Sequence, residues 1–190
     1  MSAKADALLP GIVRAIREKG PEAFALNSIA EELGTSSRML IYHFGGRDEL
    51  LGRAMHHVRQ ETISDLEVEP PTSLDEAMDS WWQYYMKHPS DMQLFFHLAS
   101  RTYESREDFE DFASSAMDSW IGYFSRASEA EGVSADLAQV LARLVLASLR
   151  GLVVDVLVSG DRTEAERALD LLRGALAAQR EALSPHITPH

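Results

Sequence analysis

Apolar residues recur every three or four positions along almost the whole chain, which is the spacing of one face of an α-helix. No stretch alternates strictly between apolar and polar residues, as a half-buried β-strand does. The pattern therefore predicts an all-α protein of about nine helices, with a small N-terminal helical head and a larger C-terminal helical domain. Three segments match the S/T-x-x-E/Q capping box that begins many helices: Ser73 to Glu76, Ser90 to Gln93 and Thr163 to Glu166.

Residues 26–51 predict two short helices joined by a tight turn. The first helix has apolar residues at helical spacing and is followed by Gly34, a residue that lets a helix end in a left-handed conformation. Hydroxyl side chains at the next three positions are suited to cap the second helix, which points Leu40 and Phe44 inward. This is a helix-turn-helix, whose second helix typically places its N-terminal half in the DNA major groove.

The same stretch resembles the signature of the TetR family of transcriptional regulators. The residues that carry the resemblance are Ile29, Ala30, Gly34, Ser36, Leu40, the run Tyr42-His43-Phe44, Arg47, Glu49 and Leu50. The chain departs from the family pattern at Leu26, Thr35, Arg38 and Ile41, so the operator sequence cannot be read by analogy. Because Leu26 replaces a threonine that often begins the first helix, Asn27 or Ser28 is expected to cap it.

The resemblance implies that one face of the motif contacts double-stranded operator DNA. The residues implied to lie at the DNA are Asn27, Thr35, Ser36, Ser37, Arg38, Ile41, Tyr42, His43 and Arg47. Among them Arg38 is the best base reader, because its forked guanidinium can grip guanine at two points. The other basic and aromatic residues of this set are expected to hold phosphates, which position a protein without reading sequence.

Two domains are expected, a helix-turn-helix DNA-binding domain (residues 1–46) and a helical ligand-binding and dimerisation domain (residues 47–190). A helix over residues 47–66 is the only predicted connector, and the resemblance implies that it transmits ligand binding to the head. One small core is predicted for the head, formed by Leu9, Ile12, Ile16, Phe24, Ile29, Leu33, Leu40 and Phe44.

Large aromatic and methionine side chains are concentrated in residues 74–124. Such side chains at helical spacing are more often core than pocket, but the resemblance implies a small-molecule site between these helices. The residues predicted to line it are Trp82, Tyr85, Phe96, Met117, Trp120 and Tyr123, with His97 and Asp118 as polar anchors. A histidine held by hydrogen bonds in the core remains the alternative for His97. The lining favours a flat, apolar or aromatic effector.

The segment 137–158 is apolar nearly all round, and such a helix must be buried on more than one face. Together with the leucine- and alanine-rich last helix, it predicts an interface between two copies of the chain. The family forms a four-helix bundle in this way, and the residues predicted at the interface are Leu144, Leu152, Val156, Leu169, Leu172 and Leu176. The resemblance thus implies a homodimeric repressor, released from a near-palindromic operator by a small effector.

The net charge of −12 argues at first against a protein that binds phosphates. Residues 1–60, however, carry a net charge of +1, and the remaining residues carry −13. This asymmetry fits a DNA-contacting head on an acidic body. The acidic total also supports an alternative, a helical ligand-binding or interaction protein that no longer reads DNA.

Catalysis and membrane insertion are not expected. There is no cysteine, no phosphate-binding glycine loop and no nucleophile elbow. The adjacent His56 and His57 would point about 100° apart on a helix and do not complete a metal site. The N-terminal residues lack the apolar core of a signal peptide, so a cytoplasmic protein without a cofactor is predicted.

Overall fold

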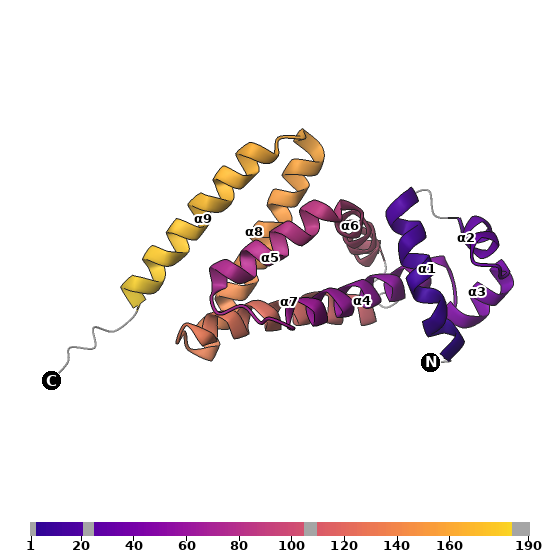
Figure 1. Cartoon of the computed structure of the whole chain (residues 1–190), viewed down its shortest axis with the longest axis horizontal. Coiled ribbons are helices and arrows are strands. Elements are labelled where there is room, and N and C mark those ends of the chain that lie inside the picture. Colours follow the sequence, from indigo (N-terminus) through magenta and orange to yellow (C-terminus); the bar gives the residue numbers. More distant parts are fainter. Residues whose placement is uncertain (1–2, 21–24, 105–109, 184–190) are drawn as a thin grey trace. The chain divides into compact units, whose positions relative to one another are not determined.

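The computed structural model describes residues 3–20, 25–104 and 110–183, and in these ranges it consists of α-helices without a β-strand (Figure 1). The helices are α1 (Ala3–Lys19), α2 (Leu26–Glu32), α3 (Ser37–Phe44), α4 (Arg47–Leu66), α5 (Leu74–Lys87), α6 (Pro89–Glu104), α7 (Glu110–Ala130), α8 (Ala135–Ser159) and α9 (Arg162–Leu183). The predicted all-α class is confirmed.

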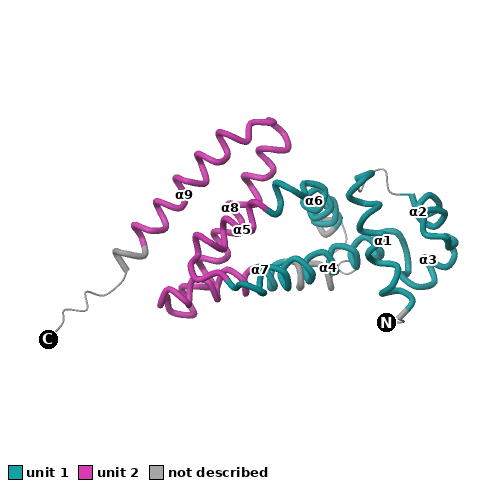
Figure 2. Tube along the Cα trace, viewed as in Figure 1, with its two compact units in different colours: residues 1–70, 84–120 teal, residues 71–83, 121–190 magenta. Residues whose placement is uncertain are grey.

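The chain divides into two compact units, which Figure 2 shows in different colours. The first unit comprises residues 1–70 and 84–120, and the second comprises residues 71–83 and 121–190. Two of the three boundaries between the units fall inside helices, α5 and α7, and the third lies between α4 and α5. The predicted functional boundary at residue 46 remains a prediction.

The head lies in the first unit, where α1 packs on α4 and α6, and α3 packs on α2 and α4. Most residues of the predicted head core are buried: Leu9, Ile12, Ile16, Ile29, Leu40 and Phe44. Leu33 is half-buried, and Phe24 lies outside the described residues. A Cβ atom at Gly11 of α1 would lie 2.4 Å from Cδ2 of Leu33, so these two segments approach each other closely.

The turn between α2 and α3 follows the sequence prediction. Gly34 has a φ of 63°, a left-handed conformation that glycine adopts without strain. Ser36 is the N-cap of α3, and its Oγ accepts a hydrogen bond from the backbone N of Met39 at 3.3 Å. The expected cap of α2 is wrong, because Ala25 takes the N-cap position and no side chain caps it. The Asn27 side chain instead accepts a hydrogen bond from Ser37.

Only one of the three predicted capping boxes forms the expected hydrogen bond from the backbone of its third helical residue to the capping hydroxyl. The backbone N of Glu76 donates to Ser73 Oγ at 3.2 Å, as the motif requires. The hydroxyl of Ser90 instead donates to a carbonyl of α1. At the start of α9, Asp161 rather than Thr163 accepts the bond from the backbone N of Glu164, at 3.1 Å. A carboxylate is a stronger acceptor than a hydroxyl, which favours Asp161.

In the second unit, α8 and α9 pack against each other. The buried residues of α8 between Ala138 and Leu149 are all apolar, and Val145, Leu146 and Leu149 are completely buried. None of the helices in the described ranges is long and apolar enough to cross a membrane.

Candidate DNA-binding site

The outer face of α3 is the candidate DNA-binding surface. The inner residues Leu40 and Phe44 are buried in the head, which fixes the rotation of the helix about its axis. Ile41 is 48% exposed, Tyr42 is 78% exposed, and Arg38 is also exposed. Within the described part of the chain, no hydrogen bond or ion pair engages Arg38. Its guanidinium is therefore available to a partner such as a base edge.

The N-terminal end of α3 is tied to α2 by polar side chains. Ser37 donates to the Asn27 side chain, so two residues predicted at the DNA hold each other. The other two predicted hydroxyl residues are Thr35, which is half-buried, and Ser36, which is exposed. α2 is in turn tied to α1, because Lys19 Nζ lies 2.7 Å from Glu32 Oε2. These bonds link α3 to α2 and α2 to α1 beside the candidate surface.

At the C-terminal end of α3, aromatic rings contact one another and a neighbouring arginine. The rings of Tyr42 and His43 meet edge to face with centroids 5.2 Å apart, and His43 is half-buried. The guanidinium of Arg53 lies 6.0 Å from the centre of the Phe44 ring, within the range of a cation–π contact. Tyr42 is thus an exposed side chain at the end of a helix whose next residues, His43 and Phe44, are held by ring contacts.

Arg47, the last predicted DNA contact, has one partner in α4 and one in α6. Its Nη1 lies 3.2 Å from Asp48 Oδ1 and 3.4 Å from Nε2 of His97. The second oxygen of Asp48 is 3.2 Å from Nη2 of Arg101, which is also in α6. A residue predicted to contact DNA therefore meets a residue predicted to contact the effector. Sequence reasoning placed these residues in separate sites and missed this link.

The predicted ligand residues differ in exposure and in unit. Trp82, Tyr85, Trp120 and Tyr123 are buried, Phe96, His97 and Met117 are half-buried, and Asp118 is exposed. Trp82 and Tyr123 belong to the second unit and the other six to the first. In the first unit, the Tyr85 and Trp120 rings have centroids 6.1 Å apart. The indole of Trp82 donates to Glu166 at 3.5 Å in the second unit. A common ligand site remains a prediction.

Sequence reasoning missed Arg59, a buried arginine on α4 that is 1% exposed. Burial lowers the pKa of its guanidinium, although the charge of Asp118 and the phenol of Tyr85 act in the opposite direction. Its Nη2 lies 3.1 Å from Nδ1 of His56. The available signal was its position beside Met55 and Thr62 on the buried face of the helix. Arg59 thus places a cation next to two of the predicted ligand residues.

One pocket among the described residues is an open groove of about 550 Å³ on α4, lined by Gln60, Glu61, Ser64 and Asp65. It contains none of the eight predicted ligand residues. In the described ranges, no three His, Asp or Glu side chains gather closely enough to hold a metal ion.

The predicted interface residues divide into two groups. Leu144 is 49% exposed, and Leu152, Val156 and Leu172 are half-buried. Leu169 and Leu176 are buried within their own subunit. Sequence reasoning did not single out the exposed apolar residues Val140, Val158 and Leu171, the last of which is 76% exposed. Val140, Leu144 and Val158 share one face of α8, since they are spaced at whole helical turns.

Comparisons with known proteins agree with this fold. Residues 8–54 match the model for bacterial regulatory proteins of the TetR family. No curated protein sequence matches the chain. A TetR transcriptional regulator from Legionella pneumophila has a similar structure, with a TM-score of 0.69 and 17% identity over 90% of this chain and 98% of its own. A TetR-like regulator from Rhodococcus sp. RHA1 gives a TM-score of 0.57 and 17% identity, over 97% and 99% of the two chains.

A third solved structure of this fold is the multidrug binding protein EbrR complexed with proflavin. Its TM-score is 0.64 at 16% identity, over 87% of this chain and 95% of EbrR. These identities support the fold alone. The family match is to regulatory proteins, and it confirms the prediction that the chain is not an enzyme.

Proposed function

We propose that the chain, whose residues 8–54 match the model for bacterial regulatory proteins of the TetR family, is a homodimeric, ligand-responsive transcriptional repressor. One observation carries the DNA-binding part of this proposal. The outer face of α3 presents Arg38, Ile41 and Tyr42 to solvent, while buried residues hold the helix in the head. A repressor of this kind acts in the cytoplasm on double-stranded operator DNA.

Arg38 is the base-reading residue in this proposal. It is the second residue of α3, and recognition helices contact base edges with their N-terminal residues. An arginine fork binds O6 and N7 of guanine together, which no other base offers. Tyr42, His43 and Arg47 lie toward the other end of the motif, where contacts to phosphates orient the head.

Arg38→Ala should weaken operator binding by about 1–3 kcal/mol and leave binding to random duplex nearly unchanged. Arg47→Ala is the comparison, because the loss of a phosphate contact weakens binding to all sequences alike. Footprinting on the DNA that flanks the gene identifies the operator, and anisotropy titrations at two salt concentrations give the affinities. An equal loss for operator and random DNA in the Arg38 variant would contradict its assignment.

The second candidate function is a helical ligand-binding or interaction protein that does not read DNA. The net charge of −12 favours it, because an acidic body repels the phosphate backbone. The same titrations separate the two functions. A specific complex that weakens with salt supports the repressor, whereas binding without sequence preference supports the alternative.

The effector part of the proposal rests on the buried aromatic side chains of α5 to α7. Pockets between bundle helices are common ligand sites, and their linings are mostly apolar. The fold neighbour EbrR is a multidrug binding protein complexed with proflavin, which supports a small-molecule site in a body of this fold. A flat, apolar or aromatic compound suits the predicted lining.

An effector that releases the operator must itself bind less tightly when the operator is present. Linkage requires the same factor in both directions, typically worth about 1–3 kcal/mol. Calorimetry with proflavin, and then with other flat aromatic compounds, should be run with and without operator. Met117→Trp, which fills the predicted site, should either block the compound or mimic it. If a compound binds with equal affinity with and without operator, the effector part of the proposal is refuted, and the body serves dimerisation alone.

The dimer part of the proposal rests on the exposed apolar surface of the second unit. Val140, Leu144 and Val158 of α8 and Leu171 of α9 are exposed to solvent in the single subunit. Large apolar side chains exposed on adjacent helices suit an interaction with another protein surface. A second copy of the chain would cover this surface with the same surface of its own, as two-fold symmetry requires.

A further inference from the structure

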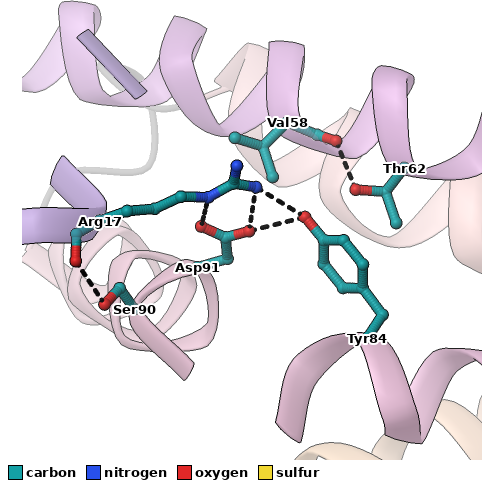
Figure 3. A network of polar contacts seen from close by, with 6 residues as sticks. All are labelled: Arg17, Val58, Thr62, Tyr84, Ser90 and Asp91. Atoms are coloured by element: carbon teal, nitrogen blue, oxygen red, sulfur yellow. Dashed lines mark hydrogen bonds and ion pairs between the residues drawn. The ribbon is translucent and has the colours of Figure 1, made fainter. Parts of the chain in front are cut away.

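An ion pair between the partly exposed Arg17 and the buried Asp91 joins α1 of the head to α6 (Figure 3). Arg17 lies in the last turn of α1, and Asp91 lies in the first turn of α6. Arg17 donates from Nε to Asp91 Oδ1 at 2.9 Å and from Nη2 to Oδ2 at 2.7 Å. The side chain of Asp91 is 1% exposed, whereas that of Arg17 is 35% exposed. Two parallel bonds fix the orientation of both groups as well as their separation.

Tyr84, in the last turn of α5, completes this cluster (Figure 3). Its hydroxyl accepts a bond from Arg17 Nη2 at 2.9 Å and donates to Asp91 Oδ2 at 2.7 Å. Burial and the neighbouring Asp91 charge raise the pKa of the phenol, so it remains a donor at neutral pH. The bond to Asp91 raises the pKa of Arg17, which stays charged. We name the three residues the Arg17–Tyr84–Asp91 joint.

Beside the joint, a further hydrogen bond ties α6 to the backbone of α1. Ser90 Oγ donates to the carbonyl oxygen of Arg17 at 3.2 Å. The last carbonyls of a helix have no partner within the helix, so this bond satisfies one of them. Two successive residues of α6 therefore bind the end of α1 with their side chains: Asp91 binds the Arg17 side chain, and Ser90 binds the Arg17 carbonyl.

The joint adds a second connection through which a change in the body can reach the head. Only α4 was predicted to connect them, because it is the segment that follows the head along the chain. In the first unit α6 packs on both α1 and α4, and Arg101 and His97 of α6 reach Asp48 and Arg47 at the start of α4. The joint is the most buried of these attachments, and its partners are 74 residues apart in the sequence.

We infer that Arg17, Tyr84 and Asp91 are positioning residues for DNA binding, which hold the head on α6 and set the orientation in which it meets DNA. The inference rests on the proposed function. A pair of heads fits a near-palindromic operator only at one spacing and orientation. A head that is loose on α6 must be ordered when it binds, and this ordering lowers affinity. Random duplex makes no such demand, since contacts to phosphates are independent of register.

Asp91→Asn tests the joint, because the amide keeps the shape but loses the charge that binds Arg17. We expect operator affinity to fall at least about tenfold, as the loss of a charge-assisted bond allows. Affinity for random duplex should stay within about twofold, since the phosphate contacts are unchanged. Tyr84→Phe removes one hydroxyl and should give a smaller change in the same direction. Arg14→Gln, at an exposed position on α1, is the matched control and should bind as the wild type does.

A merely structural role predicts a different result, in which Asp91→Asn lowers operator and random affinity equally. That result would overturn the inference. Circular dichroism should show unchanged helix content in each variant. Should Asp91→Asn fail to fold, Tyr84→Phe carries the same comparison, and an unchanged ratio of operator to random affinity in Tyr84→Phe overturns the inference.

A distance measurement tests the joint without DNA. The chain has no cysteine, so Glu31→Cys on α2 and Gln93→Cys on α6 carry spin labels at exposed positions without background. In labelled chain mixed with an excess of unlabelled chain, so that a dimer carries a single pair of labels, we expect one narrow distance distribution in the wild-type background and a broader one with Asp91→Asn. An equally narrow distribution in both would overturn the inference. If the wild-type protein does not distinguish operator from random DNA, the proposed function is refuted. The distances between the spin labels would still test whether the joint holds the head on α6.

Discussion

Leu144→Glu and Leu171→Glu should each convert the dimer into monomers and abolish specific operator binding. Both side chains are exposed in the subunit and lie on the apolar surface of α8 and α9 that we assign to the interface. In a two-fold dimer each substitution occurs twice, and an unpaired charge buried there costs several kcal/mol. A monomer presents one head to a two-headed site, so the operator complex should be lost with the dimer.

Sedimentation at micromolar concentration and operator titration measure the two effects in the same samples. Gln139→Glu adds the same charge on another side of α8, at a position already exposed to water, and should leave both unchanged. A stable wild-type monomer at micromolar concentration would refute the proposed dimer. Specific operator binding by a monomeric Leu171 variant would refute the requirement for two heads.

Leu40→Ala should destabilise the head by about 2–5 kcal/mol, the range observed for truncating a fully buried leucine. Leu40 is completely buried, and it anchors α3 against the rest of the head. Its loss should weaken binding to operator and random DNA together, because the whole recognition surface depends on a folded α3. Hydrogen exchange of the amides in residues 26–44 measures the local stability.

The neighbouring residue provides the matched control. Ile41 is 48% exposed, so Ile41→Ala should change stability by no more than about 0.5 kcal/mol. If Ile41 faces DNA as proposed, its variant should change operator affinity without changing the exchange of the head. Equal destabilisation by the two variants would show that α3 is rotated from the orientation described.

Local signals in the sequence predicted the helices and the motif well. The periodic apolar residues of α1 and α3 indicated which side would be buried, and Leu40 and Phe44 lie there. Gly34 marked a turn that needs a positive φ, which is a local requirement of the backbone. Helix caps were less predictable. Asn27 and Ser90 have side chains that suit a cap, but each bonds to a residue of another helix instead.

The interface residues show that helical spacing does not predict which apolar residues are buried within the subunit and which are exposed to a partner. Leu169, Leu171, Leu172 and Leu176 are all apolar residues of α9, and the sequence alone ranked three of them as contacts. The structure buries Leu169 and Leu176 within their own subunit and leaves Leu171 exposed. Periodicity identifies residues that share a face, but it does not identify the surface that covers that face.

The sequence by itself determined the all-α class, the helix-turn-helix and the exposed residues of α3, because each depends on interactions within a few residues. Only the tertiary structure brought Arg17 to Asp91 and Arg47 to His97, pairs separated by 74 and 50 positions. Charged side chains on helix surfaces carry no periodic signal of their partners. Their pairing is decided when the apolar faces of α1, α4 and α6 pack and bring the polar edges of those helices together.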